Sequence, residues 1–184
     1  MTQTTPKSTF ETQLLRPAKP KKGDEAWAFL ILPKSASDIL PRRGRTTVQG
    51  ELNGQPFQAT LEPDGQLSHW LKVSEALQKA AGVVAGDTVS VTIAPVEDEP
   101  EPEVPADLKE ALSAWPEAQK TWEDTTTLAR VDWIHWIESP KMPKTRQKRV
   151  ANGCDMLASG KKRVCCFDPS GHYSNSLSAP KAAE

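Results

Sequence analysis

Hydrophobic and polar residues alternate along the first half of the chain with the period of two that is typical of β-strands. The segments that show this alternation, or that are hydrophobic throughout, span residues 10–16, 27–32, 46–52, 55–62, 67–73 and 88–93. Residues 27–32 are hydrophobic on both faces, so we predict that this strand is central in its sheet. Asn53-Gly54 joins two of the segments and predicts a type I′ hairpin, because both residues tolerate the positive φ angles of that turn.

A short helix is predicted within this half, before the last strand. Ser74 can cap its first turn, Glu75 places an acidic group near its N-terminus, and Gly82 can end it. About six short strands with one hydrophobic face each need closure to protect their edges. We therefore predict that this half folds as a small β-barrel.

From about residue 105 onward, the hydrophobic residues recur with the period of an α-helix. Leu108, Leu112 and Trp115 share one stripe of the first predicted helix, which ends at Trp115-Pro116. The elements predicted after it are a short helical turn carrying Ala118 and Trp122, helices over 126–138 and 145–159, and a short strand over 163–167. The fold class is therefore α+β, with a β-barrel followed by a mainly helical domain.

Proline is frequent, with 16 residues among 184, and its densest cluster divides the chain. Residues 95–105 are acidic and contain four prolines, which exclude a helix or an interior strand. The organisation that we predict is a β-barrel domain over 1–97, an acidic linker over 98–105, a helical domain over 106–170 and a flexible tail over 171–184.

The overall composition excludes several classes of protein. A formal net charge of −1 at pH 7 is not that of a generic polyanion-binding protein. No segment approaches the roughly 18 hydrophobic residues that a membrane-spanning helix needs, and the polar N-terminus does not resemble a secretory signal. Three cysteines, two of them adjacent, do not make a disulfide framework. We therefore expect a cytoplasmic protein without membrane insertion.

Charge is distributed unevenly in the second half. Residues 97–124 carry ten acidic and two basic side chains, whereas residues 130–163 carry nine basic and three acidic ones. Arg130, Arg146 and Arg149 are candidates for binding an anionic ligand or partner, and Arg146 lies close to the buried stripe of its helix. The other interpretation is that the acidic segment pairs with the basic helix inside the domain, and the sequence allows both.

A second basic cluster follows Pro41, where Arg42, Arg43 and Arg45 surround a glycine and could cradle a phosphate group. Trp70 lies opposite the hydrophobic face of its predicted strand, and an exposed indole could stack on a base or anchor a partner. Nucleic-acid binding through this loop and the basic helix is the alternative function. The structural interpretation is a solvated loop and a tryptophan that packs in the core.

Cys165 and Cys166 are candidates for a reactive thiol, because the basic residues 161–163 could lower a thiol pKa; burial is the other interpretation. Adjacent strand residues point to opposite faces and no Cys-x2-Cys pair exists, so we expect no metal site. His69 shares the hydrophobic face of residues 67–73, as a core histidine does. No Ser–His–Asp triad can be assembled, and we expect a binding protein without a cofactor rather than an enzyme.

Two stretches of the first half resemble a small β-barrel domain of uncharacterised function, namely PRRGRTTVQGELNGQPF at 41–57 and AAGVVAGDTV at 80–89. In the second half, PEVPADLKEAL at 102–112 resembles the start of the helical domain of the YdeI/OmpD-associated family, also called bacteriocin-protection proteins. TRQKR at 145–149 and MLASGK at 156–161 resemble later parts of that domain.

This resemblance implies a bacterial cytoplasmic protein linked to tolerance of antimicrobial peptides or to envelope stress. It implies no catalytic residue. Together with the basic helix, it leads us to expect a non-enzymatic binding or stress-protection protein whose partner is a protein or an anionic ligand.

Overall fold

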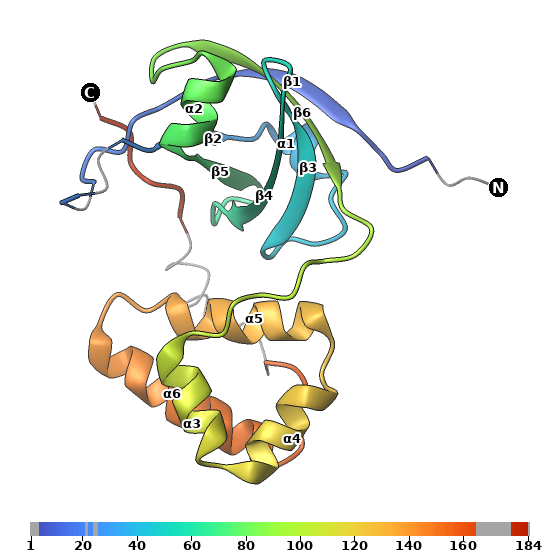
Figure 1. The fold of residues 1–184 in the computed structure, drawn as a ribbon, viewed down its shortest axis with the longest axis vertical. Helices are drawn as coiled ribbons and strands as arrows, with labels where there is room; N and C mark the ends of the chain where they lie inside the picture. Colours follow the sequence, from blue (N-terminus) through green and yellow to red (C-terminus); the bar gives the residue numbers. More distant parts are fainter. Residues whose placement is uncertain (1–3, 21, 24–25, 165–177, 184) are drawn as a thin grey trace. The chain divides into compact units, whose positions relative to one another are not determined.

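The computed structural model describes residues 4–20, 22–23, 26–164 and 178–183. The chain forms two compact units. The first contains the residues up to Asp98 together with the described C-terminal residues, and the second begins at Glu99. The first unit is a sheet with two short helices and the second is helical (Figure 1), so the predicted α+β class is confirmed.

The first unit is built on a six-stranded sheet in the order β1-β6-β3-β4-β5-β2, in which every neighbouring pair is antiparallel. The strands are β1 (Ser8–Gln13), β2 (Ala28–Ile31), β3 (Thr46–Leu52), β4 (Gln55–Pro63), β5 (His69–Val73) and β6 (Thr88–Pro95). The sheet curls into a half-barrel whose inner face carries the alternating residues of the sequence pattern. The largest of these buried side chains include Leu14, Leu30, Leu52, Leu61, Leu71 and Ile93.

The two ends of the curled sheet meet at one bridge. Leu15, just beyond β1, exchanges two backbone hydrogen bonds of 2.7 and 2.8 Å with Phe29 of β2. The prediction that residues 27–32 form a central strand is therefore wrong, because β2 is the last strand of the sheet order. Phe29 is nevertheless buried on the outer face, where the rings of Trp27 and Trp70 each lie 6.2 Å from its ring centroid.

Local turn and cap signals in this unit are confirmed. Asn53 and Gly54 have φ angles of 48° and 83°, as a type I′ hairpin requires. The Ser74 hydroxyl accepts a hydrogen bond from the Leu77 amide at the start of α2 (Glu75–Ala81), and Gly82 ends the helix in the left-handed conformation. A second helix, α1 (Lys34–Ser37), was not predicted, because four residues are too short to show a helical period.

The described C-terminal residues return to the first unit. The Ala18 amide donates a hydrogen bond to the Lys181 carbonyl, and the Ala183 amide donates one to the Arg16 carbonyl, both at 2.8 Å. The prediction of a flexible tail over 171–184 is wrong for these last residues, since backbone pairing holds them beside residues 16–18. Residues 171–177 of the predicted tail lie outside the described part of the chain.

Up to residue 164, where its described part ends, the second unit contains four helices: α3 (Ala106–Ser113), α4 (Pro116–Asp124), α5 (Thr127–Glu138) and α6 (Pro143–Ala158). Their core is formed by Leu108, Leu112, Ala118, Trp122, Trp133, Ile134, Ile137, Val150, Cys154 and Leu157. Two details differ from the prediction. Residues 116–124 form a full helix rather than a turn, and Trp115, which precedes that helix, is 37% exposed instead of buried.

Residues 96–105 contain neither helix nor strand, as predicted, whereas Pro95 is the last residue of β6. The segment is not a free linker throughout. Val104 packs against the helical core, and Glu101 binds α5. The strand predicted over 163–167 is absent at residues 163–164, and its remainder lies outside the described residues. None of the helices within the described ranges is long and hydrophobic enough to cross a membrane.

Candidate functional site

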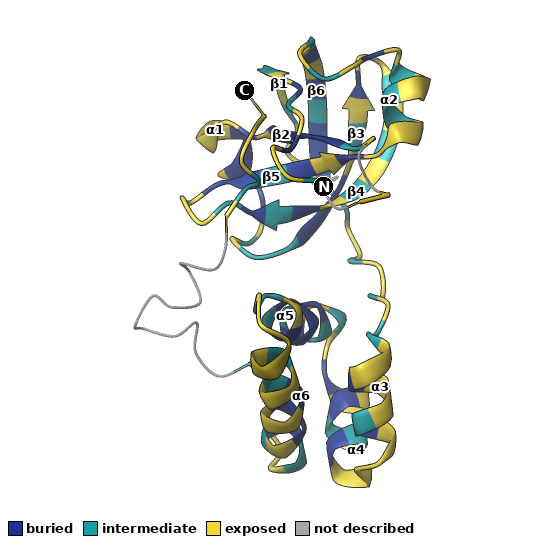
Figure 2. Cartoon of the chain, turned by 90° about the vertical axis from the view of Figure 1, so that its left-hand side faces the viewer, coloured by how far each residue is buried: buried dark blue, intermediate teal, exposed yellow. Residues whose placement is uncertain are grey.

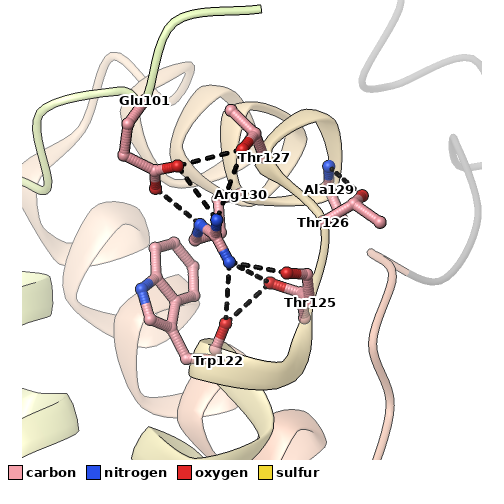
Figure 3. A network of polar contacts seen from close by, with 7 residues as sticks. All are labelled: Glu101, Trp122, Thr125, Thr126, Thr127, Ala129 and Arg130. Carbon is pink, nitrogen blue, oxygen red and sulfur yellow. Dashed lines mark hydrogen bonds and ion pairs between the residues drawn. The ribbon is translucent and has the colours of Figure 1, made fainter.

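Arg130 of α5 joins three segments of the helical unit. Its Nη1 donates hydrogen bonds to the carbonyl oxygens of Thr125, at 2.6 Å, and Trp122, at 3.3 Å, at the C-terminal end of α4 (Figure 3). Nε and Nη2 contact the two carboxylate oxygens of Glu101 at 2.6 and 2.9 Å. The side chain is only 15% exposed, and its hydrogen bond lowers the pKa of the Glu101 carboxyl. Arg130 therefore caps α4 and fixes the acidic segment.

Arg146 connects α6 to the first turn of α3. Its Nε and Nη2 donate to the two carboxylate oxygens of Asp107 at 2.8 and 3.1 Å, a bidentate pair. The hydrogen bond from Arg146 lowers the pKa of the Asp107 carboxyl. Asp107 also lies where the N-terminal dipole of α3 favours a negative charge.

Arg149, one turn further along α6, caps the end of α5. Its Nη1 donates to the Trp136 carbonyl oxygen at 2.6 Å and to the Ser139 hydroxyl at 2.7 Å. The guanidinium carbon lies 5.1 Å from the centre of the Trp136 ring, which adds a cation–π contact. The carbonyl that it binds is one of those that an α-helix leaves without an internal partner.

These contacts agree with one of the two interpretations of the charge pattern for Arg130 and Arg146. Pairing of the acidic segment with the basic helices is confirmed by the Arg130–Glu101 and Arg146–Asp107 ion pairs. The structure does not bring Arg130, Arg146 and Arg149 together around a common space; each guanidinium serves a different junction between helices.

The exposed cations of the helical unit are mainly lysines. One side of α6 is exposed (Figure 2). Lys144 and Lys148 are exposed and lie one turn apart on this helix, and Lys141, also exposed, precedes it. We call Lys141, Lys144 and Lys148 the lysine face. Lys161, Lys162 and Arg163 add exposed charge beyond the end of α6. In the sequence, Lys144 and Lys148 are four residues apart, a spacing that places both on one side of a helix. This spacing could have distinguished them from the arginines of the same helix.

In the second predicted cluster, at residues 42–45, Arg43 and Arg45 also bind groups within their own unit. Arg43 donates from Nη1 to the Leu67 carbonyl oxygen at 2.6 Å and pairs with Asp38 at 3.2 Å. Arg45 Nε lies 2.9 Å from Glu62, with a side chain that is mostly buried, and Arg42 is half-buried. A phosphate cradle would require Arg43 and Arg45 to leave these partners, so nucleic-acid binding through this loop stays a prediction.

The arrangement of a curled sheet followed by four helices agrees with what comparison with protein families finds. Residues 101–160 match the family described as bacteriocin-protection, YdeI or OmpD-associated. Residues 10–93 match a domain of unknown function, DUF1905. The helical unit is thus similar to the YdeI/OmpD-associated family, and the sheet unit is similar to DUF1905. The resemblance seen in the sequence is thereby confirmed, and no curated protein matches the chain.

In the sheet unit, the structure shows a polar pair that sequence reasoning missed. The Ser37 hydroxyl lies 2.5 Å from His69 Nδ1, and His69 Nε2 lies 2.9 Å from the Gly44 carbonyl oxygen. A carbonyl can only accept, so Nε2 carries the proton and Nδ1 accepts from Ser37. His69 is fully buried and Ser37 is 2% exposed, which excludes a substrate from this Ser–His pair in the observed conformation. Burial lowers the pKa of His69 and keeps the ring neutral.

The remaining candidates are distributed over the chain. Trp70 is half-buried in an aromatic cluster with Trp27 and Phe29. Cys165 and Cys166 lie outside the described residues, whereas Cys154 is buried in the helical unit and burial raises the pKa of its thiol. Among the described residues, no group of three or more His, Cys, Asp or Glu side chains is arranged to hold a metal ion.

Proposed function

We propose that this protein is a non-catalytic, cytoplasmic binding protein that contributes to bacteriocin protection by docking an acidic partner on the lysine face. The observation that carries this proposal is a difference in environment between the arginines and the lysines of the helical unit. Arg130, Arg146 and Arg149 bind groups within the domain, whereas the lysine face is exposed to solvent. The family match supplies the link to bacteriocin protection.

The chemistry of the two side chains suits this division. A guanidinium group binds carboxylates and carbonyls with a fixed fork of donors, which suits permanent contacts between helices. An exposed ammonium on a flexible stem acts as a mobile point charge, which suits attraction of an acidic surface. Exposed lysines also contribute little to the stability of the domain. They can therefore be exchanged without unfolding it.

The test is survival of a bacterial strain challenged with a bacteriocin while it expresses the full chain or a variant. The informative variant is Lys141→Gln/Lys144→Gln/Lys148→Gln. The matched control is Lys109→Gln/Lys120→Gln, which neutralises exposed lysines on α3 and α4 instead. We expect the full chain and the control to raise survival and the triple variant to lose most of that effect.

Two results would overturn the proposal. If the wild-type chain gives no protection, the assigned function is wrong. If the triple variant protects as well as the wild type at equal expression, the function survives and the lysine face is not where the partner docks.

A further inference from the structure

Strand β1 is the first strand of the sheet order and pairs with β6 on one side (Figure 1). On its other side, Leu15 bridges to Phe29, and beyond this bridge the two chain segments diverge. The Thr12 side chain, which shares the inner face of the sheet, reaches the Ile31 carbonyl oxygen at 3.4 Å. Ala36 of α1 is buried in the inner core as well. β2 and α1 therefore continue past the inner face of β1 rather than along its edge.

The backbone groups of Thr9 and Glu11 point to this edge. The Leu14 amide donates to the Asp87 carbonyl on the β6 side, and alternate residues of an antiparallel strand face the same neighbour. The even-numbered residues of β1 therefore bind β6, whereas the odd-numbered ones face away from it, as Leu15 does. Within the described part of the chain, the amides and carbonyls of Thr9 and Glu11 form no backbone hydrogen bond. Such an edge is a template for the addition of another strand.

Three side chains beside this edge lie on the outer face of the sheet. Phe10 packs against the inner core, so its neighbours Thr9 and Glu11 point outward. The Thr9 hydroxyl lies 3.0 Å from the Thr92 hydroxyl on that face, and Lys7 lines the same hollow as Thr92. Lys7, Thr9 and Glu11 are exposed. Neither Lys7 nor Glu11 forms an ion pair with any other described residue, so both charges are available to a partner.

The order of the charges along this edge is self-complementary. Lys7 and Glu11 stand two residues before and two residues after Thr9. If two copies of the strand run antiparallel with Thr9 opposite Thr9, each Lys7 lies opposite Glu11 of the other copy. Side chains directly opposite each other have Cβ atoms about 4.5–5.5 Å apart, close enough for an ion pair. A register centred on Glu11 would instead place two carboxylates opposite each other, so the charges favour a two-fold axis at Thr9.

We propose that β1 pairs with β1 of a second copy of this chain, antiparallel and centred on Thr9, so that the two sheets join at their edges. Backbone hydrogen bonds between the two Thr9 residues, and between Lys7 and Glu11, hold the copies together. The two Lys7–Glu11 ion pairs set the register. One short strand from each copy buries little surface, so the dimer is weak and forms reversibly. This self-association belongs to the sheet unit and is independent of the lysine face.

Sedimentation velocity of the full chain at low salt, from about 10 µM to about 1 mM, covers the range of a weak interface. We expect the fraction of dimer to rise with concentration. Thr9→Pro removes the amide at the two-fold axis from both copies, while the pairing with β6 does not use that amide. We expect it to weaken dimerisation about tenfold or more. Thr9→Val keeps the amide and should dimerise as the wild type does.

Charge reversal tests the register without touching the backbone. Lys7→Glu and Glu11→Lys each place like charges opposite one another, so we expect each variant alone to dimerise about tenfold more weakly. An equimolar mixture of the two variants restores opposite charges and should dimerise, as should Lys7→Glu/Glu11→Lys. The matched control is Glu51→Lys, which reverses an exposed charge on β3, away from this edge, and should leave dimerisation unchanged.

Three results would overturn the proposal. The first is a wild-type chain that stays monomeric throughout the concentration range. The second is a dimer that Thr9→Pro and both charge reversals leave unchanged, because its interface would then lie elsewhere. The third is a mixture of Lys7→Glu and Glu11→Lys that dimerises no better than either variant alone, because the antiparallel register would then be wrong.

Discussion

Arg146 of α6 and Asp107 of α3 form a two-point ion pair, with Nε 2.8 Å and Nη2 3.1 Å from the two carboxylate oxygens. The two residues are 39 positions apart in the chain, so the pair fixes the first helix of the domain to the last. From the sequence, Arg146 was a candidate for binding either an anionic ligand or a carboxylate of its own domain. The carboxylate that it binds is supplied by the domain itself.

A double-mutant cycle of Arg146→Gln and Asp107→Asn measures this pair. Both side chains are partly exposed, so we expect a coupling energy of about 0.2–1 kcal/mol in urea unfolding, smaller at high salt. Because the folded-state pKa of Asp107 is lowered, its contribution is present above the unfolded-state value near ~3.9 and is lost as the pH falls through the folded-state pKa. A coupling energy that does not decrease in acid would contradict this assignment.

Arg130 should matter more for stability than Arg146. It is less exposed, and its removal leaves the Trp122 and Thr125 carbonyl oxygens and Glu101 without this donor. We expect Arg130→Ala to lower the free energy of unfolding by about 1–3 kcal/mol. Arg130→Lys keeps the charge but not the fork of donors, so it should fall between the alanine variant and the wild type. Equal stability of all three proteins would show that the contacts in Figure 3 contribute nothing.

The Ser37–His69 pair predicts a dependence of stability on pH. The folded-state pKa of His69 is lowered by burial, so the unfolded chain binds a proton more readily than the folded one. Stability should therefore be full above the unfolded-state value near ~6.5 and should fall as the pH drops below it. We expect His69→Asn to reduce this slope between pH 8 and 5. Ser37→Ala should cost about 1–3 kcal/mol at pH 8, because it leaves the buried Nδ1 without its donor.

Two glycines of the sheet should respond differently to alanine. A Cβ atom at Gly50 would overlap the Thr92 carbonyl oxygen of β6, since β3 and β6 approach closely there. Gly54 has open space around it, and its cost comes only from the positive φ of the hairpin. We expect Gly50→Ala to lower the free energy of unfolding by about 3 kcal/mol or more, and Gly54→Ala by about 1–2 kcal/mol. The reverse order in urea unfolding would contradict the register between β3 and β6.

The features that the sequence predicted well depend on neighbours in the chain. The Asn53-Gly54 hairpin and the Ser74 and Gly82 helix ends each follow from the conformations of two or three adjacent residues. The features that it missed depend on distant contacts. β2 is hydrophobic on both faces, and this pattern is typical of a central strand. In the structure, Trp27 and Trp70 cover the outer face of β2 at Phe29, so this edge strand has the burial that a second layer would give.

The candidate site shows the same limit. Both opposite charge blocks are visible in the sequence, and internal pairing is one of their two interpretations. Which arginine meets which carboxylate depends on tertiary packing, such as that of α3 against α6 for Arg146. Ser37 and His69 are 32 residues apart, and their pairing depends on the loop that carries Gly44.

The central claim is that the arginines of the helical domain hold it together while the lysine face binds the partner. The most direct test measures urea unfolding and survival under bacteriocin challenge in parallel for Arg130→Ala and for Lys141→Gln/Lys144→Gln/Lys148→Gln. We expect Arg130→Ala to lower the free energy of unfolding. We expect the lysine variant to keep its free energy of unfolding within about 0.5 kcal/mol of the wild type and to lose protection. The opposite result would contradict this division of roles: a lysine variant that protects as well as the wild type, and an arginine variant that is fully stable but does not protect.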